Sequence, residues 1–140
     1  MDEVLAQAVR NWLIKAKSDL ESARILATAS QPHVDTALYH CQQGAEKALK
    51  GFLVYKERFQ KTHDLNSLIS EASTLVSEFT TLQPEAARLT PYATEYRYPP
   101  TVTAYIEPGM AAYHEAIADA GRVYDFVLSK LPAQCKPDST

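Results

Sequence analysis

Residues 40–65 read HCQQGAEKALKGFLVYKERFQKTHDL, and this stretch sets the fold. Its first part places apolar side chains every three or four residues, which is the spacing of one face of an α-helix expected over about 34–56. The apolar members of that face are Leu38, Cys41, Ala45, Ala48, Leu49 and Phe52. The pattern then stops, and Thr62-His63-Asp64 has the composition of a new helix start, with Thr62 or His63 near the cap and Asp64 in the first turn. A helix, a short connection and a second helix are therefore predicted.

The other face of the 34–56 helix is polar. Its members are His40, Gln43, Glu46, Lys47 and Lys50. Ammonium groups one turn apart converge on an anion, so Lys47 and Lys50 with Gln43 are candidates for holding a phosphate or a nucleotide. Two other interpretations remain open at this point: the face is solvated, or the lysines pair with Asp19 of another helix. Gly44 costs about 1 kcal/mol against Ala in a helix interior, so a close helix crossing is expected there.

A long amphipathic helix precedes this stretch, with Asp2 as its expected N-cap and an end near Pro32. Its apolar stripe consists of Leu5, Val9, Trp12, Ala16, Leu20, Ala23 and Ala27. Asp19 falls near the centre of that stripe, at 100° per residue. Because an unpaired buried carboxylate is costly, we predict that Asp19 has a partner inside the protein.

Further helices are predicted after residue 65. One begins at Leu65, a short one follows Pro84, and the last runs from about Pro108 to Leu131. Residues 90–108 contain four prolines and form a long tyrosine-rich loop. No strand pattern appears, so the prediction is an all-α fold: an antiparallel up-and-down bundle of four to five helices. We expect a single domain over 1–131 and a flexible C-terminal tail over 132–140.

Composition narrows the functional classes. A chain of 140 residues with net charge −3 argues against a broad basic surface for duplex DNA. Cys41 and Cys135 match neither a disulfide framework nor a zinc site, and no apolar run approaches a membrane span, so a cytoplasmic protein without metal or cofactor is expected. His114-Glu115 begins like a zinc-protease motif, but Ala118 stands where the second ligand would be.

The tyrosine-rich loop and the helix start carry the remaining candidates. Arg97 lies between Tyr96 and Tyr98, where it could stack on a base and contact a phosphate, or where the tyrosines could simply pin the loop to the bundle. His63 could be a general acid or base, or a hydrogen-bonding residue of the turn. Catalytic residues remain unassigned, with His63 and Arg97 as the candidates.

Together these features resemble the HEPN family, the higher eukaryotes and prokaryotes nucleotide-binding domains. The similarity extends from about Trp12 to Leu131. The residues that carry it are Trp12-x-x-x-Ala16-x-x-Asp19-Leu20-x-x-Ala23, Gln42-Gln43-x-Ala45-Glu46-Lys47-Ala48-Leu49-Lys50, Thr62-His63-Asp64-Leu65 and Arg97-Tyr98-Pro99. The resemblance favours the branch with the Thr-His-Asp-Leu and Arg-Tyr-Pro motifs.

The resemblance implies a helical bundle, often a homodimer, that works with a minimal nucleotidyltransferase in a toxin-antitoxin-like two-component system. It also implies nucleotide binding, and for many members metal-independent cleavage of RNA. The ligand-binding residues implied here are Gln43, Lys47, Lys50, His63, Arg97 and Tyr98, and the structural polar residues are Asp19, Glu46 and Asp64.

One departure separates this sequence from the RNase members. These use an Arg, four to six residues and a His near the start of the last long helix, where Arg97 has no such His. The spacing occurs between Arg58 and His63, in the connection between two other helices. Three functions therefore follow as alternatives: a module that binds a nucleotide or a partner, an RNase toxin, or a structural homodimer without a ligand.

Overall fold

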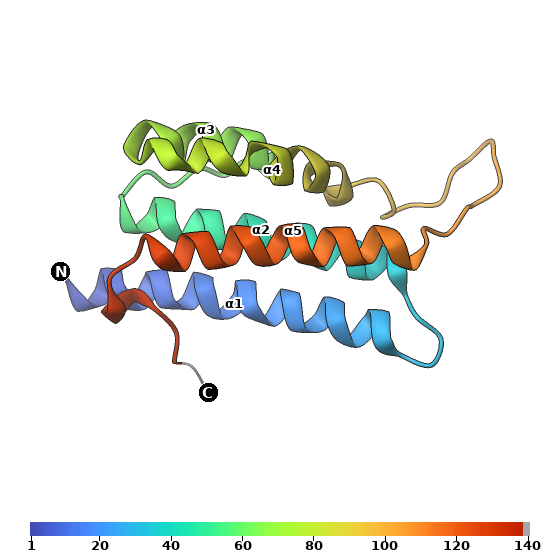
Figure 1. The fold of residues 1–140 in the computed structure, drawn as a ribbon, viewed down its shortest axis with the longest axis horizontal. Helices are drawn as coiled ribbons and strands as arrows, with labels where there is room; N and C mark the ends of the chain where they lie inside the picture. Colours follow the sequence, from blue (N-terminus) through green and yellow to red (C-terminus); the bar gives the residue numbers. More distant parts are fainter. Residues whose placement is uncertain (139–140) are drawn as a thin grey trace.

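The computed structural model describes residues 1–138 and consists of helices joined by short connections and one long loop (Figure 1). The α-helices are α1 (Glu3–Thr28), α2 (Val34–Tyr55), α3 (Leu65–Leu75), α4 (Gln83–Leu89) and α5 (Met110–Ser129). Three short 3₁₀ helices accompany them: η1 (Ser77–Leu82), η2 (Thr90–Ala93) and η3 (Ala133–Cys135). The described residues contain no strand, and the predicted all-α bundle of four to five helices is confirmed.

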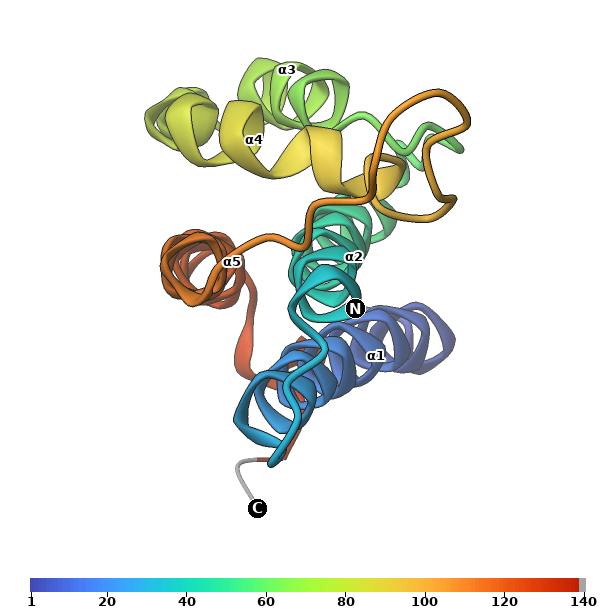
Figure 2. The same cartoon turned by 90° about the vertical axis from the view of Figure 1, so that its right-hand side faces the viewer.

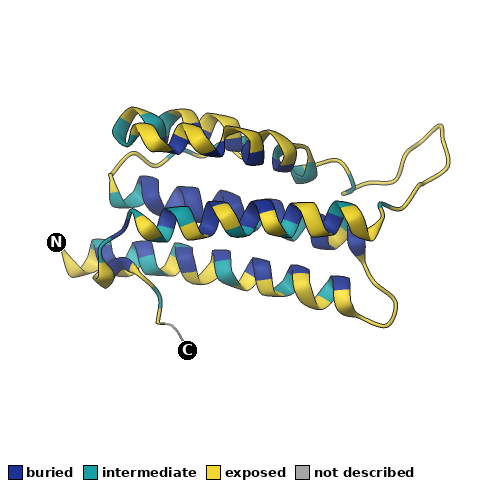
Figure 3. Cartoon of the chain, viewed as in Figure 1, coloured by how far each residue is buried: buried dark blue, intermediate teal, exposed yellow. Residues whose placement is uncertain are grey.

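Helix α2 is the centre of the bundle. Figure 2 shows it between α1 on one side and the layer of α3 and α4 on the other, with α5 beside it. Apolar residues from all five helices meet around α2, whose middle is buried over most of its surface (Figure 3). The predicted apolar face of α2 lies in this core, and the Phe52 ring contacts the Phe79 ring at a centroid distance of 4.5 Å. The polar residues of α2 are therefore held on a rigid element.

Two glycines let α1 approach α2 closely. A Cβ at Gly44 would lie 2.7 Å from Leu20 Cδ2 and 3.2 Å from the Ala16 carbonyl oxygen. At Gly51 it would lie 2.5 Å from Leu13 Cδ2. These distances are shorter than van der Waals contact, so the close crossing predicted at Gly44 is present and recurs two turns later.

The helix starts differ in detail from the prediction. Asp2 caps α1 as expected, since its Oδ1 accepts a hydrogen bond from the Val4 amide at 3.0 Å. Asp64 is itself the cap of α3, accepting from the Asn66 amide at 3.0 Å, and does not lie in the first turn. The reason is that Asp64 has the extended backbone of a cap residue, with φ −84° and ψ 111°.

The last described residues pack onto the bundle. Helix η3 contacts α1, and the Cys135 side chain is buried. The flexible tail expected over 132–140 stays a prediction, and its residues 139–140 lie outside the described part of the chain. None of the helices within residues 1–138 has the length and apolar character needed to cross a membrane.

Candidate functional site

A buried polar network lies where the 56–64 connection crosses α2. Glu46, 3% exposed, is its centre. Its carboxylate accepts hydrogen bonds from Lys50 Nζ at 3.0 Å and from Gln42 Nε2 at 3.1 Å. His63 Nδ1 lies 3.0 Å from Glu46 Oε2, and Gln42 Nε2 also donates to the His63 carbonyl oxygen at 3.2 Å. The Gln-Gln and Thr-His-Asp-Leu motifs are therefore joined in one network through Glu46.

The network fixes the ionisation of Glu46. Burial acts to raise the pKa of its carboxyl group, but the hydrogen bonds from Lys50, His63 and Gln42 outweigh burial and hold that pKa below its usual value. Because an ionised carboxylate only accepts hydrogen bonds, His63 Nδ1 carries the proton that faces Glu46. The His63 side chain is nevertheless 74% exposed, so its Nε2 edge remains open to solvent.

Asp19 has partners inside the protein, and Lys47 is one of the two lysines that the sequence offered. Lys47 Nζ lies 2.5 Å from Asp19 Oδ2, and His40 Nδ1 lies 2.8 Å from Oδ1. The α1 carboxylate is thereby tied to two side chains of α2. Lys50 is not paired with Asp19. Its ammonium group is bonded to Glu46, one turn earlier on α2. Both lysines are thus already paired with carboxylates, and Gln43 donates to Gln42 Oε1 at 2.7 Å.

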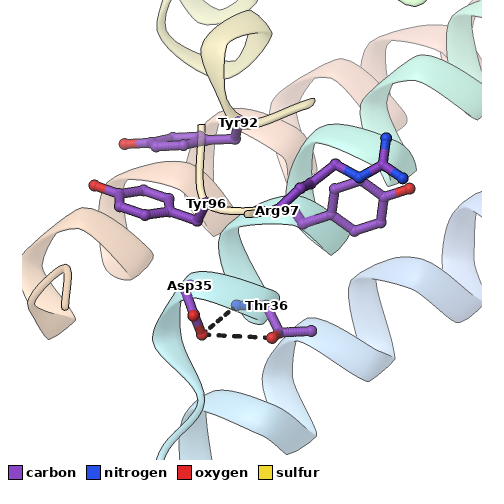
Figure 4. A pocket seen from close by; sticks show the side chains of 6 residues that line it. Asp35, Thr36, Tyr92, Tyr96 and Arg97 are labelled. Carbon is purple, nitrogen blue, oxygen red and sulfur yellow. Dashed lines mark hydrogen bonds between the residues drawn. The ribbon is translucent and has the colours of Figure 1, made fainter. Parts of the chain in front are cut away.

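Arg97 lies at a small pocket of about 250 Å³ at the other end of the same face of α2. The pocket is lined by Asp35, Thr36, Tyr39, Tyr92, Tyr96 and Arg97. Figure 4 shows the Tyr92 and Tyr96 rings one above the other, with centroids 6.2 Å apart and planes inclined by 21°. The Arg97 guanidinium lies 5.7 Å from the Tyr39 ring centroid and 5.8 Å from that of Tyr98. Arg97 therefore lies near two aromatic rings.

No carboxylate among residues 1–138 forms an ion pair with Arg97. Its charge is available to a ligand at the pocket mouth. Burial raises the pKa of Tyr92 and Tyr96, so both phenols stay neutral near physiological pH and can donate hydrogen bonds. The pocket thus combines flat aromatic surface, neutral donors, one cation and the Asp35 carboxylate.

The loop that carries Arg97 is fastened to the start of α2. Tyr105 Oη donates to Asp35 Oδ2 at 2.7 Å. This hydrogen bond lowers the pKa of Asp35 and raises the pKa of Tyr105 to about 12. The 94–109 loop, which protrudes at one end of the bundle in Figure 1, is thereby held near the pocket.

The predicted site residues form three groups: Arg97 with Tyr98, His63 with Glu46 and Lys50, and Lys47 with Asp19. Tyr39, Gln43, Glu46 and Lys50 recur at intervals of four, three and four residues, so they share one face. Arg97 lies beside Tyr39, and His63 lies beside Glu46. Residues 39 and 46 are about 10 Å apart along the axis of α2. The structure therefore does not show His63 and Arg97 as one contacting pair. Tyr98, 76% exposed, flanks Arg97 and does not line the pocket.

A second polar cluster was missed in the sequence. Asp119 of α5 is fully buried and accepts two hydrogen bonds from Arg88 of α4, at 2.8 and 2.9 Å. Arg122 also bonds Asp119, and Glu85 lies 3.7 Å from Arg122. The hydrogen bond to Asp119 raises the pKa of Arg88. The sequence signal that could have found this cluster is an acidic residue on the apolar stripe of a helix, as Asp119 is on α5. The same kind of signal led to the prediction for Asp19.

Arg58 and His63, whose spacing matches the RNase motif, do not share a site. Arg58 Nη1 contacts Glu71 at 3.4 Å, whereas His63 contacts Glu46. No group of three or more metal-ligating side chains occurs within the described residues.

The five α-helices and the absence of strands among residues 1–138 place the chain among small all-α bundle domains. The HEPN domain family matches residues 9–131, and the chain belongs to this family. A crystal structure of TT1696 from Thermus thermophilus is similar, with TM-score 0.77 and 28% identity over 88% of this chain and 98% of that one. ST0689, described as an archaeal HEPN homologue, has TM-score 0.70 and 26% identity over 87% of this chain and 96% of that one. No curated protein matches the chain significantly.

Proposed function

We propose that this HEPN-domain protein is a nucleotide-binding module whose recognition site is the pocket around Arg97. The observation that carries the proposal is the Arg97 guanidinium over the Tyr39 ring, 5.7 Å from its centroid, without an ion-pair partner among residues 1–138. A guanidinium at an aromatic pocket suits a ligand that has both a flat base and a phosphate.

The size and polarity of the pocket fit one nucleotide unit. Its 250 Å³ lies just below the range of about 300–1,000 Å³ typical of small-ligand sites, so it admits a base or a ribose but not a longer ligand in full. Tyr92 and Tyr96 offer phenols to a base, and the Asp35 carboxylate offers an acceptor to a ribose hydroxyl. In this proposal Lys47 and Lys50 hold the bundle through Asp19 and Glu46, and any contact they make with a ligand is secondary.

Calorimetric titration of ATP and AMP at low salt tests the site. Arg97→Ala is expected to weaken binding by about tenfold or more, because a charge-assisted hydrogen bond is worth about 1.5–3 kcal/mol. Arg24→Ala, an exposed arginine on α1, is the matched control and should bind as the unaltered protein does. The absence of saturable heat with the unaltered protein would reject nucleotide binding. Equal affinity of Arg97→Ala and Arg24→Ala would reject the pocket around Arg97 as its site.

An RNase is the second candidate, because His63 is oriented by buried Glu46 and keeps its other nitrogen open. A histidine held in this way can take or give a proton at a ribose 2′-hydroxyl. The test is RNA cleavage in cells that express the protein, His63→Ala or Arg97→Ala. Negligible cleavage by all three versions would exclude the RNase function.

We extend the proposal to a partner on the basis of family resemblance. The partner is a minimal nucleotidyltransferase in a toxin-antitoxin-like pair, and the chain itself is a homodimer of the branch with the Thr-His-Asp-Leu and Arg-Tyr-Pro motifs. The neighbouring reading frame and light scattering of the purified protein test these two points. A monomer at micromolar concentration would contradict the homodimer. A structural dimer without ligand remains the alternative if no nucleotide binds.

A further inference from the structure

A second aromatic surface lies at the opposite end of the same side of α2. Trp12 of α1 and Phe59 of the 56–64 connection have ring centroids 5.7 Å apart, with planes inclined by 41°. Phe59 is 48% exposed and Trp12 is only partly buried. The pair thus presents aromatic surface to solvent.

Lysine side chains lie beside this pair, and one of them has no ion-pair partner among the described residues. A depression of about 280 Å³ is lined by Trp12, Asn11, Lys15 and Lys47. Lys15 is exposed and forms no ion pair among the described residues, whereas Lys47 is bound to Asp19. The Lys50 ammonium lies 5.8 Å from the Phe59 ring centroid and is itself paired with Glu46. Aromatic surface beside cationic side chains is the combination that binds single-stranded nucleic acids, through base stacking and phosphate contact.

We propose that Trp12 and Phe59 form a stacking platform for a base of single-stranded RNA, whose phosphate meets Lys15. The proposal rests on the proposed function for the ligand class and adds a second binding position to it. Figure 2 shows the 56–64 connection and the 94–109 loop on the same side of α2, away from α5. The two positions are marked on α2 by Tyr39 and Lys50, about 16 Å apart along the axis, so the ligand that uses both is an oligonucleotide.

The protein provides its own reporter for this platform. Trp12 is the only tryptophan in the sequence, so a base stacked on it changes the whole tryptophan emission. Titration with a short oligouridylate at low salt is expected to quench the emission saturably, and added salt should weaken the binding because a phosphate contact releases counterions. Phe59→Leu is expected to weaken binding about tenfold, because stacking needs an aromatic ring. Phe59→Tyr keeps a ring and should bind as the unaltered protein does. Lys15→Gln should weaken binding and reduce the salt dependence, whereas Arg24→Gln on the same helix should do neither.

Two results would overturn the platform. One is unchanged tryptophan emission at saturating oligouridylate. The other is equal affinity of Phe59→Leu and the unaltered protein, with circular dichroism showing that both are folded. In either case Trp12 and Phe59 only attach the connection to α1. Loss of binding in Arg97→Ala but not in Phe59→Leu would reject the platform and keep the pocket, and the reverse would reject the pocket and keep the platform.

Discussion

Removing Glu46 should destabilise the protein strongly, because it leaves a buried charge without a partner. The Lys50 and Glu46 side chains are only 6% and 4% exposed, and their charged atoms are 3.0 Å apart. Breaking a buried ion pair from one side costs about 3–5 kcal/mol. That is a large part of the total stability of about 5–15 kcal/mol expected of a domain. Glu46→Ala is therefore expected to lose about 3 kcal/mol or more.

The paired variant Glu46→Leu/Lys50→Met separates this cause from lost packing. It removes both charges and fills the space with apolar groups, so it should recover most of the stability lost in Glu46→Ala. Lys61→Met, on the exposed connection, is the control and should change stability by about 0.5 kcal/mol or less. Urea unfolding followed by circular dichroism measures all of them. A loss below about 1 kcal/mol in Glu46→Ala, or a double variant as unstable as Glu46→Ala, would refute the reasoning.

The same residue gives the protein an acid dependence. The folded-state pKa of Glu46 is below its usual value of 4.5, so its contribution is complete above that pH and is lost as the pH falls through the folded-state pKa. Glu46→Gln should therefore show a smaller loss of stability between neutral and acid pH than the unaltered protein. Identical pH profiles of the two proteins would contradict the assignment.

Three further predictions concern the packing of the bundle. Arg88→Met should lower the Tm more than Asp119→Leu, because only the first leaves the fully buried carboxylate short of a partner; an inverse order in thermal unfolding would contradict this. Gly51→Val should cost about 1–3 kcal/mol in urea unfolding, since even its Cβ would lie 2.5 Å from Leu13 Cδ2, and an unchanged midpoint would show that α1 can move away. Burial raises the pKa of Cys41 to about 12, so peptide mass spectrometry should find it unlabelled by iodoacetamide at neutral pH unless the protein is unfolded.

Helical periodicity was enough to predict the bundle. The stripe through Val9, Ala16 and Ala23 and the Asp2 cap depend on local spacing and local hydrogen bonds, which a sequence displays directly. The need of Asp19 for a partner was also predictable, because the cost of burying a lone carboxylate does not depend on the fold.

The choice of partners was not predictable. Lys47 and Lys50 are three residues apart on α2, yet one pairs with Asp19 of α1 and the other with Glu46 of its own helix. Successive residues of a helix point 100° apart, so side chains three residues apart can contact different elements. Which element covers each lysine depends on the path of the 56–64 connection, which the sequence does not give. The Arg97 pocket was not predictable for a similar reason. It also needs Tyr39, which is far from Arg97 in the sequence, and Tyr92, which belongs to the 3₁₀ helix η2.

The location of a bound nucleotide tests the proposed function most directly. Amide chemical shifts should be recorded by NMR while AMP is added to the isotope-labelled protein at low salt. The proposal predicts saturable shifts concentrated at residues 35–39 and 92–97, which need about tenfold more AMP or beyond in Arg97→Ala and are unchanged in Arg24→Ala. Shifts that are absent at millimolar AMP, or that fall outside these two segments, would contradict a nucleotide site at Arg97.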